Sequence, residues 1–306
     1  MINQWYHINK KGGTAMRNLL IAIICIVTIN GFALQPALAD SNTSISIAGA
    51  ATVDKAVAQI IETLEKQGFD IVLVVDHAAN APPPPDGEEL RPTQVIFARQ
   101  PPIFERLTRR LDDNITIDLP LKFLVYEDAD GYIQVLSNPT GYLVDRFDIK
   151  IKDPVLRLLQ LSVNQFGKPA SGLVSIKSSQ TLADTVDSLI AEIESRARAG
   201  FRIPLVLDFT EDDRGRKHRH RGKLLQQVLI VFGNPNVGTP LMQADQRIGL
   251  NLPQEYLVSE DKDGQVNIIW NDPFFIAECC NIQGENGRLA AIAGALLDIA
   301  EKGAGN

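Results

Sequence analysis

One stretch of sequence occurs twice and decides the fold: LPLKFLVYEDADG at residues 119–131 and LPQEYLVSEDKDG at residues 252–264. Each copy is an apolar strand followed by an acidic turn that ends in glycine, which is typical of a β-hairpin. The repetition extends toward the N-terminus, because Gly68-Phe69 is matched by Gly200-Phe201 at nearly the same spacing. The chain therefore contains two tandem copies of one domain.

Each copy predicts the element order strand, helix, four strands, helix. Thr52 and Thr181 are expected to cap amphipathic helices that end near Gly68 and Gly200. The expected strands cover residues 44–47, 71–75, 95–98, 122–126 and 132–136 in copy one, and 173–177, 203–207, 228–232, 255–258 and 265–270 in copy two. A last helix is expected from Asp153-Pro154 and over residues 289–299. The fold class is α+β: two tandem β-α-β4-α domains, each an antiparallel sheet with helices packed on one face.

A secretory signal is predicted at the N-terminus. An apolar run covers residues 19–27 behind Arg17, and Ala37-Leu38-Ala39 supplies the small residues that signal peptidase requires. Met16 is interpreted as the true start, with residues 1–15 upstream of it. The apolar run is too short to cross a bilayer, so the mature chain is expected to have no transmembrane segment and to be exported to the periplasm or the extracellular space.

The mature chain is expected to form a first domain at residues 40–166, a linker at 167–172 and a second domain at 173–306. Removing residues 1–39 takes away three basic residues and no acidic ones from the 30 basic and 37 acidic residues of the chain, which leaves a net charge of −10. This charge argues against nucleic acid as a partner. Cys279 and Cys280 are adjacent, so a buried thiol pair is favoured over a vicinal disulfide or a soft metal site.

Several ordered motifs resemble a known family. Val75-Asp76-His77-Ala78-Ala79-Asn80-Ala81, Leu119-Pro120-Leu121-Lys122 and Phe232-Gly233-Asn234-Pro235 are similar to the family catalogued as domain of unknown function 302, and further matches cover nearly the whole mature chain. The resemblance implies a β-α-β4-α fold similar to that of the TATA-box-binding protein. It implies no activity, because the family has none established.

The two copies depart from the family pattern in opposite places. Copy one keeps Asp76-His77 but has Arg99-Gln100-Pro101-Pro102 where the glycine-asparagine-proline turn belongs. Copy two keeps that turn at residues 233–235 but has Asp208-Phe209 in place of the aspartate-histidine pair. We therefore predict one composite site to which each copy contributes what the other lacks, with His77, Asn80, Asn234 and Thr239 as its ligand-binding residues.

The chemistry of these residues leaves alternatives open. His77 beside Asp76 could serve as a general base, but strand-end histidines also cap turns, and no nucleophile stands at a recognisable spacing. Thr239-Pro240 is expected to begin a helix whose N–H groups could hold an anion, although plain capping is favoured. With an imidazole and a helix start converging on it, the composite site is expected to favour a small anion or carboxylate over an apolar molecule.

Neither metal nor cofactor is expected. The acidic turns at Asp128 and Asp261 lack the carboxylates that a full calcium loop requires. The basic loop Arg214–Lys223, with His218 and His220, is interpreted as solvated, with anionic lipid, a polyanion or a metal as alternatives.

The leading hypothesis is an exported, non-enzymatic binding or accessory protein for an unknown small molecule, acting as a monomer whose two repeats form an intramolecular pseudo-dimer. The alternatives are a hydrolase or metal-dependent enzyme that uses His77 and Asp76, and an interaction module for envelope proteins.

The signal predicts the N-terminus of the exported protein. Intact-mass measurement of the protein recovered from outside the cytoplasm should give a chain that begins at or near Asp40. A mass that retains residues 19–27 would contradict cleavage.

Overall fold

The computed structural model describes residues 43–46, 52–84, 88–99, 113–138, 142, 146–147, 172–210, 217, 219–220, 223–224, 226–280 and 282–305. They belong to one compact unit, residues 34–306. The expected signal, the linker at 167–171, the helix expected from Asp153 and most of the basic loop lie outside the described residues.

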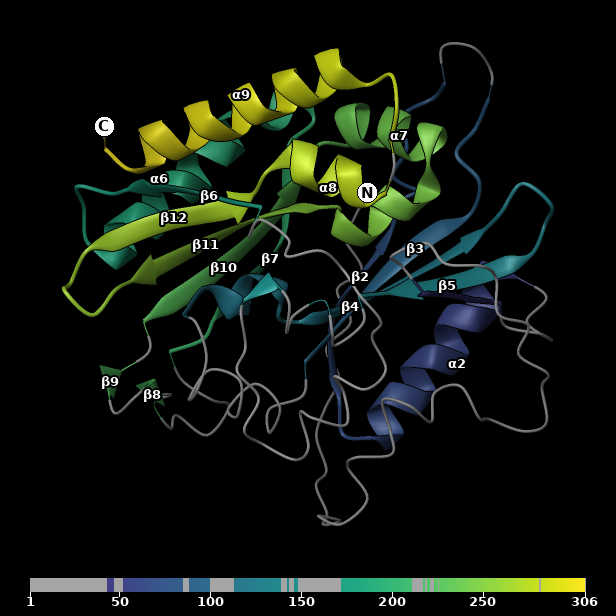
Figure 1. Cartoon of the computed structure of the whole chain (residues 1–306), viewed down its shortest axis with the longest axis horizontal. Coiled ribbons are helices and arrows are strands. Elements are labelled where there is room, and N and C mark those ends of the chain that lie inside the picture. Colours follow the sequence, from purple (N-terminus) through teal and green to yellow (C-terminus); the bar gives the residue numbers. More distant parts are fainter. Residues whose placement is uncertain are drawn as a thin grey trace. The chain divides into compact units, whose positions relative to one another are not determined.

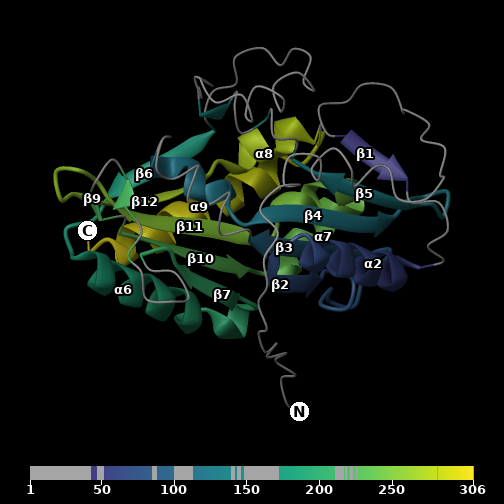
Figure 2. The same ribbon diagram turned by 90° about the horizontal axis from the view of Figure 1, so that it is seen from below.

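The first repeat forms a five-stranded antiparallel sheet with the strand order β1-β5-β4-β3-β2 (Figures 1 and 2). Its elements are β1 (Thr43–Ser46), α2 (Val53–Lys66), β2 (Asp70–Asp76), β3 (Thr93–Arg99), the 3-10 helix η1 (Asp113–Asp118), β4 (Leu121–Glu127) and β5 (Ile133–Ser137). The hairpin of β4 and β5 turns at Gly131, as the repeated stretch predicts.

The second repeat forms a sheet of the same order, β6-β12-β11-β10-β7. Its elements are β6 (Leu173–Lys177), α6 (Leu182–Ser195), η2 (Ala197–Ala199), β7 (Arg202–Asp208), β8 (Arg219–His220), β9 (Lys223–Leu224), β10 (Gln227–Gly233), α7 (Pro235–Ala244), η3 (Gln246–Asn251), β11 (Gln254–Glu260), β12 (Val266–Asn271), α8 (Pro273–Cys279) and α9 (Asn286–Gly303). The two antiparallel repeats confirm the α+β fold, whereas the likeness to the TATA-box-binding protein stays a prediction. The helix expected from Thr239-Pro240 is present as α7 but begins earlier, at Pro235, and α8 was not expected from the sequence.

The predicted caps and stops of the first helix in each repeat are present. The Thr52 hydroxyl accepts a hydrogen bond from the Lys55 N–H at 3.3 Å, and Thr181 accepts one from Asp184 at 3.2 Å. Gly68 and Gly200 follow the helices with φ of 82° and 104°, a conformation that favours glycine. At Gly200 a side chain would also collide with Asn234 Oδ1, 2.6 Å from the position of a Cβ.

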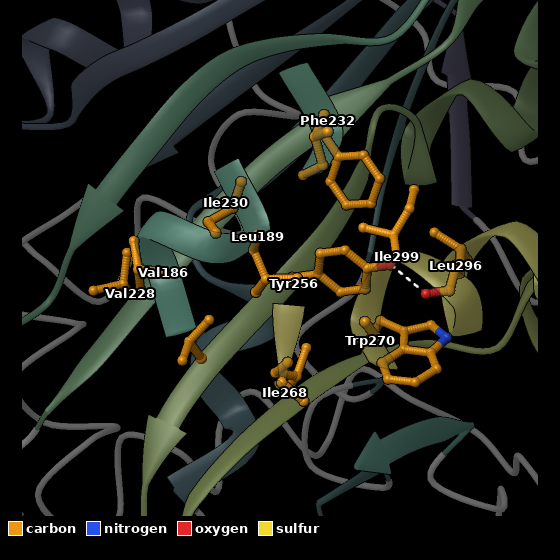
Figure 3. Close-up of a cluster of buried hydrophobic side chains, with 14 of the residues drawn as sticks. Val186, Leu189, Val228, Ile230, Phe232, Tyr256, Ile268, Trp270, Leu296 and Ile299 are labelled. Atoms are coloured by element: carbon orange, nitrogen blue, oxygen red, sulfur yellow. Dashed lines mark hydrogen bonds between the residues drawn. The ribbon is translucent and has the colours of Figure 1, made fainter. Parts of the chain in front are cut away.

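One face of the second sheet packs against α6 and α9 (Figure 2). Tyr256 lies at the centre of this core, stacked on Phe232 with ring centroids 4.6 Å apart and edge-on to Trp270 at 5.7 Å (Figure 3). Its hydroxyl donates to Leu296 O at 2.5 Å, which satisfies the polar end of a fully buried ring. This bond ties β11 to α9.

A second core is shared by the two repeats. It contains Val95, Phe97, Leu124 and Leu136 of the first sheet together with Leu229, Val231, Leu257 and Ile269 of the second. Since each of these strands is apolar on this face, separating the repeats would expose both faces to water at a cost of about 25 cal/mol per Å². The repeats therefore contact each other through a hydrophobic core.

Each repeat also places its 3-10 helix against the sheet of the other repeat. η1 of repeat one contacts β11 and β12, and η3 of repeat two contacts β3, β4 and β5. Thr116 of η1 donates to Gln227 Oε1 at 2.9 Å, and Gln246 of η3 donates to Thr93 Oγ1 at 2.8 Å. Thr93 and Gln227 begin the equivalent strands β3 and β10, so the two contacts are reciprocal.

At the centre of this contact, Lys122 Nζ donates to Glu255 Oε2. The two residues occupy equivalent positions of the repeat, 133 residues apart, and their side chains are 4% and 1% exposed. Contact between equivalent positions is what a two-fold arrangement of copies produces. Burial raises the pKa of Glu255, and the charge of Lys122 opposes that rise.

This buried ion pair predicts a large loss of stability when one partner is removed. Lys122→Met should lower the free energy of unfolding by about 3–5 kcal/mol, because it leaves the Glu255 carboxylate buried without its cation. The double variant Lys122→Met/Glu255→Leu should regain most of that loss, as measured by urea denaturation.

The exposed pair of Lys66 and Glu62, whose side chains are 71% and 66% exposed, offers a matched control. Lys66→Met should change stability little, since exposed ion pairs are screened by solvent. A Lys122→Met variant as stable as this control would contradict the role given to the buried pair.

Candidate functional site

The four ligand-binding residues proposed from the sequence line one cavity of about 590 Å³. His77 and Asn80 come from the end of β2 in repeat one, and Asn234 and Thr239 come from the start and middle of α7 in repeat two. α7, α9, β7 and β10 supply most of the remaining wall. The structure thus brings together residues from both repeats in a common cavity.

His77 is buried and neutral. Its side chain is 7% exposed, and burial lowers its pKa from 6.5 to about 4, against the opposing effect of the backbone carbonyls of Gly249 and Leu252. Nε2 lies 3.3 Å from Gly249 O. Because a carbonyl can only accept, Nε2 carries the proton in this bond.

Gly249 allows this approach between repeats. A Cβ at this position would lie 3.0 Å from Leu124 Cδ1, 3.2 Å from Met242 Sδ and 3.5 Å from His77 Cδ2. A side chain at this position would therefore press against Leu124 and Met242. Sequence reasoning missed Gly249, because its partner lies in the other repeat and no motif spacing indicates it.

Asp76 does not support His77 as a catalytic partner. Its carboxylate accepts from Ala79 N–H at 2.8 Å and from Gln94 Nε2 at 3.2 Å, and Asn80 Nδ2 donates to its main-chain carbonyl at 2.6 Å. Within the described residues it makes no hydrogen bond to the imidazole. The carboxylate and Asn80 hold the turn after β2, which is the capping interpretation of this motif.

The helix start predicted at Thr239 is wrong. α7 begins at Pro235, with Asn234 as its N-cap accepting from Asn236 N–H at 3.0 Å. Asn-Pro at 234–235 carries the same cap-then-proline signature as Thr-Pro at 239–240 and comes first after the strand, so the helix forms there.

The new helix start does not offer open donors to an anion. Val237 and Gly238 N–H both bond to Asn234 O at 3.0 Å, and Asn234 Nδ2 donates to Ala199 O at 2.9 Å. Asn234 shapes the cavity wall, and its polar groups are occupied by the protein itself.

Thr239 lies inside α7 and is 4% exposed. Its hydroxyl oxygen has no hydrogen-bond partner among the described residues. A buried polar atom without a partner costs about 1–3 kcal/mol, and such atoms are rare in folded proteins. Thr239 therefore combines a place in the cavity lining with a hydroxyl that is itself buried and lacks a partner among the described residues.

The rest of the lining is mainly apolar. It includes Phe201, Pro204, Phe232, Val237, Leu241, Met242, Leu252, Ala291, Ile292, Ala295 and Leu296. The ionisable lining residues in the described part of the chain are His77, Arg202 and Arg288, with neither aspartate nor glutamate among them. Sequence reasoning did not find the two arginines, because nothing in their local motifs distinguishes them.

The other sequence candidates are not among the described residues that line this cavity. In the portion of the chain that the structure describes, no group of three histidine, cysteine or acidic side chains is placed to hold a metal ion. Cys280 is buried against Leu241, Ile276 and Leu289, and the side chain of Cys279 lies outside the described residues. Part of the basic loop pairs as the short strands β8 and β9.

None of the described helices is long and apolar enough to cross a membrane.

With the fold and the cavity in view, the family can be stated. The sequence pattern for the domain of unknown function DUF302 matches residues 45–164 and again residues 174–301. The chain belongs to the DUF302 family. The two matches confirm the resemblance inferred from the motifs, in two tandem copies.

Known relatives of this DUF302 protein include curated proteins named fluoride-specific ion channel FluC 1, from Brucella suis and Brucella abortus. Both are 38% identical over 109 residues, which is 35% of this chain and 40% and 37% of theirs. The chain thus matches about two fifths of the length of these relatives.

Among solved structures, an uncharacterized DUF302 protein from Bacillus stearothermophilus aligns with a TM-score of 0.37 and 18% sequence identity. The alignment covers 44% of this chain and 98% of that one.

The buried, neutral His77 predicts a pH dependence of stability. Its pKa is about 4 in the folded protein and 6.5 when unperturbed, so the unfolded chain binds more protons between these values. The stability is fully present above pH 6.5 and falls as the pH decreases toward 4, by about 3 kcal/mol. The His77→Phe variant carries the residue that the second repeat has at the equivalent position, Phe209. It should lack the loss of stability that protonation of His77 causes at low pH.

Urea denaturation of both proteins at pH 7 and pH 4 measures the difference. Comparing wild type with the variant cancels the titration of carboxylates common to both. Equal losses of stability in the two proteins would show that His77 is not held neutral.

Proposed function

We propose that this DUF302 protein is an exported, non-enzymatic binding protein that holds a small, mainly apolar molecule in the cavity lined by both repeats. The observation that carries the proposal is the unpartnered hydroxyl of Thr239 in the wall of that cavity. Export rests on the N-terminal signal alone.

The size and lining of the cavity favour a small organic molecule. A volume of about 590 Å³ lies within the range of small-molecule sites, about 300–1,000 Å³, and such sites are mostly apolar with a few placed polar groups. Water against the apolar lining is unfavourable, so an apolar occupant would be stabilised by displacing it. The apolar wall changes the expectation from the sequence, which favoured a small anion or carboxylate over an apolar molecule.

The polar groups of the cavity would orient the occupant. Thr239 supplies a hydroxyl that can donate or accept, and His77 contributes a neutral imidazole fixed by its bond to Gly249. Both groups are rigidly placed, which lowers the entropy lost when a ligand binds.

The geometry does not favour the enzymatic alternative. A general base normally has a partner that orients it, and the carboxylate of Asp76 is used by the turn after β2. The pKa of His77, about 4, is also far below neutral pH, where a general base works best.

The curated relatives are named as fluoride-specific ion channels, so fluoride is a second ligand to consider. A monatomic anion is far smaller than this cavity and would leave the apolar wall in contact with water. Fluoride binding is therefore tested separately from the binding of an organic molecule.

The proposal predicts opposite effects of one substitution on stability and on binding. In the ligand-free protein, Thr239→Val should raise the free energy of unfolding by about 1 kcal/mol, because it removes a buried hydroxyl that lacks a partner. The same variant should retain less of any small molecule that co-purifies with wild type, as measured by native mass spectrometry. A separate titration with sodium fluoride tests whether the protein binds this halide.

Thr185→Val is the matched control. The Thr185 hydroxyl is fully buried and donates to Thr181 O at 2.8 Å, so its removal should destabilise the protein and leave binding unchanged. If Thr239→Val destabilises as Thr185→Val does and retains the same molecules as wild type, the cavity is not a binding site.

A further inference from the structure

We infer that the occupant is an amphipathic organic acid, with its carboxylate on Arg202 and its apolar body against the cavity wall. This inference rests on the proposed function and names the class of ligand. Three features of the cavity carry it: the geometry of Arg202, the charge of the lining, and the apolar wall beyond it.

Arg202 is held in place by the main chain. It is the first residue of β7, and its Nη1 donates to Ala197 O at 2.7 Å and to Phe201 O at 2.6 Å. No described residue accepts from its Nε or Nη2, the edge of a guanidinium that binds a carboxylate through two parallel hydrogen bonds. Arg202 is exposed to solvent, so these N–H groups contact water before a ligand binds, and the bonds to Ala197 O and Phe201 O orient the side chain.

The charge of Arg202 is not neutralised by a described carboxylate within 4.0 Å. Arg288, the other arginine of the lining, differs, because its Nε donates to Glu285 Oε2 at 2.9 Å. The whole chain carries a formal charge of −7, yet the described lining of this cavity contains two arginines and no acidic residue. The cavity is therefore a local site for an anion on an acidic protein.

The apolar wall excludes an inorganic anion as the complete occupant. Phe201, Phe232, Leu241 and Leu296 line the same cavity as Arg202. An inorganic anion on Arg202 would leave these side chains in contact with water, whereas a hydrocarbon would leave the guanidinium edge to water alone and the Thr239 hydroxyl without a partner. An acid with an apolar body satisfies both parts of the lining.

A matched pair of ligands tests the inference. Octanoate and 1-octanol have the same chain length and differ in charge, and acetate carries the carboxylate without the apolar body. Isothermal titration calorimetry should show octanoate bound at least about tenfold more tightly than 1-octanol, since hydrogen bonds to charged groups are the stronger ones. Acetate should bind more weakly than either.

Two arginine variants locate the acid. Arg202→Gln should abolish the preference for octanoate and leave the affinity for 1-octanol unchanged. Arg288→Gln is the matched control, because its cation already has an acidic partner, and it should retain most of the preference. Thermal denaturation of both variants verifies that they are folded.

The outcomes separate this inference from the proposed function. If neither octanoate nor 1-octanol binds wild type, the apolar binding site itself is refuted. Equal affinity for octanoate and 1-octanol refutes an organic acid as the ligand, whereas the proposed apolar binding site is still supported. A preference that survives Arg202→Gln and is lost in Arg288→Gln refutes the assignment to Arg202.

Discussion

The contact between Lys122 and Glu255 is the interaction on which the rest of the structure depends. A lysine and a glutamate this deeply buried are tolerated because each neutralises the other and because the shared core excludes water around them. The 3-10 helices complete this contact between the repeats: η3 packs on the first sheet and brings the carbonyl of Gly249 to His77. The second repeat supplies most of the cavity wall, and the first repeat adds Val75, His77 and Asn80.

Much of the fold could be predicted from the sequence, because its signals are local. The repeated hairpin, the threonine caps and the stopping glycines depend on residues within a few positions of one another. The start of α7 could not be fixed in the same way, since Asn234-Pro235 and Thr239-Pro240 carry equivalent signatures. The choice between them depends on where β10 ends, which is set by pairing with β7 and β11.

The candidate site could be predicted in part, because comparing the two copies showed which motif each of them lacks. Opposite losses in the two copies indicated that His77, Asn234 and Thr239 belong together, and the structure places all three in one cavity. The roles of these side chains were not predictable, because they depend on partners such as Ala199 O and Gly249 O that no spacing reveals. The position of His77 is filled in the second repeat by Phe209, which packs in the shared core. One backbone position thus supports a polar contact in one copy and a hydrophobic contact in the other.

The location of the Lys122–Glu255 pair bears on the history of the chain. In a dimer of identical subunits, a residue on the two-fold axis faces its own copy, so a charge there meets a like charge, at a cost of several kcal/mol. Opposite charges at this place require two positions that mutate independently, which a duplicated repeat provides. The pair therefore makes the two repeats non-interchangeable at this position: two first repeats would bury two lysines, and two second repeats would bury two glutamates. Replacing one repeat by a copy of the other would place like charges together in the core and destabilise the protein.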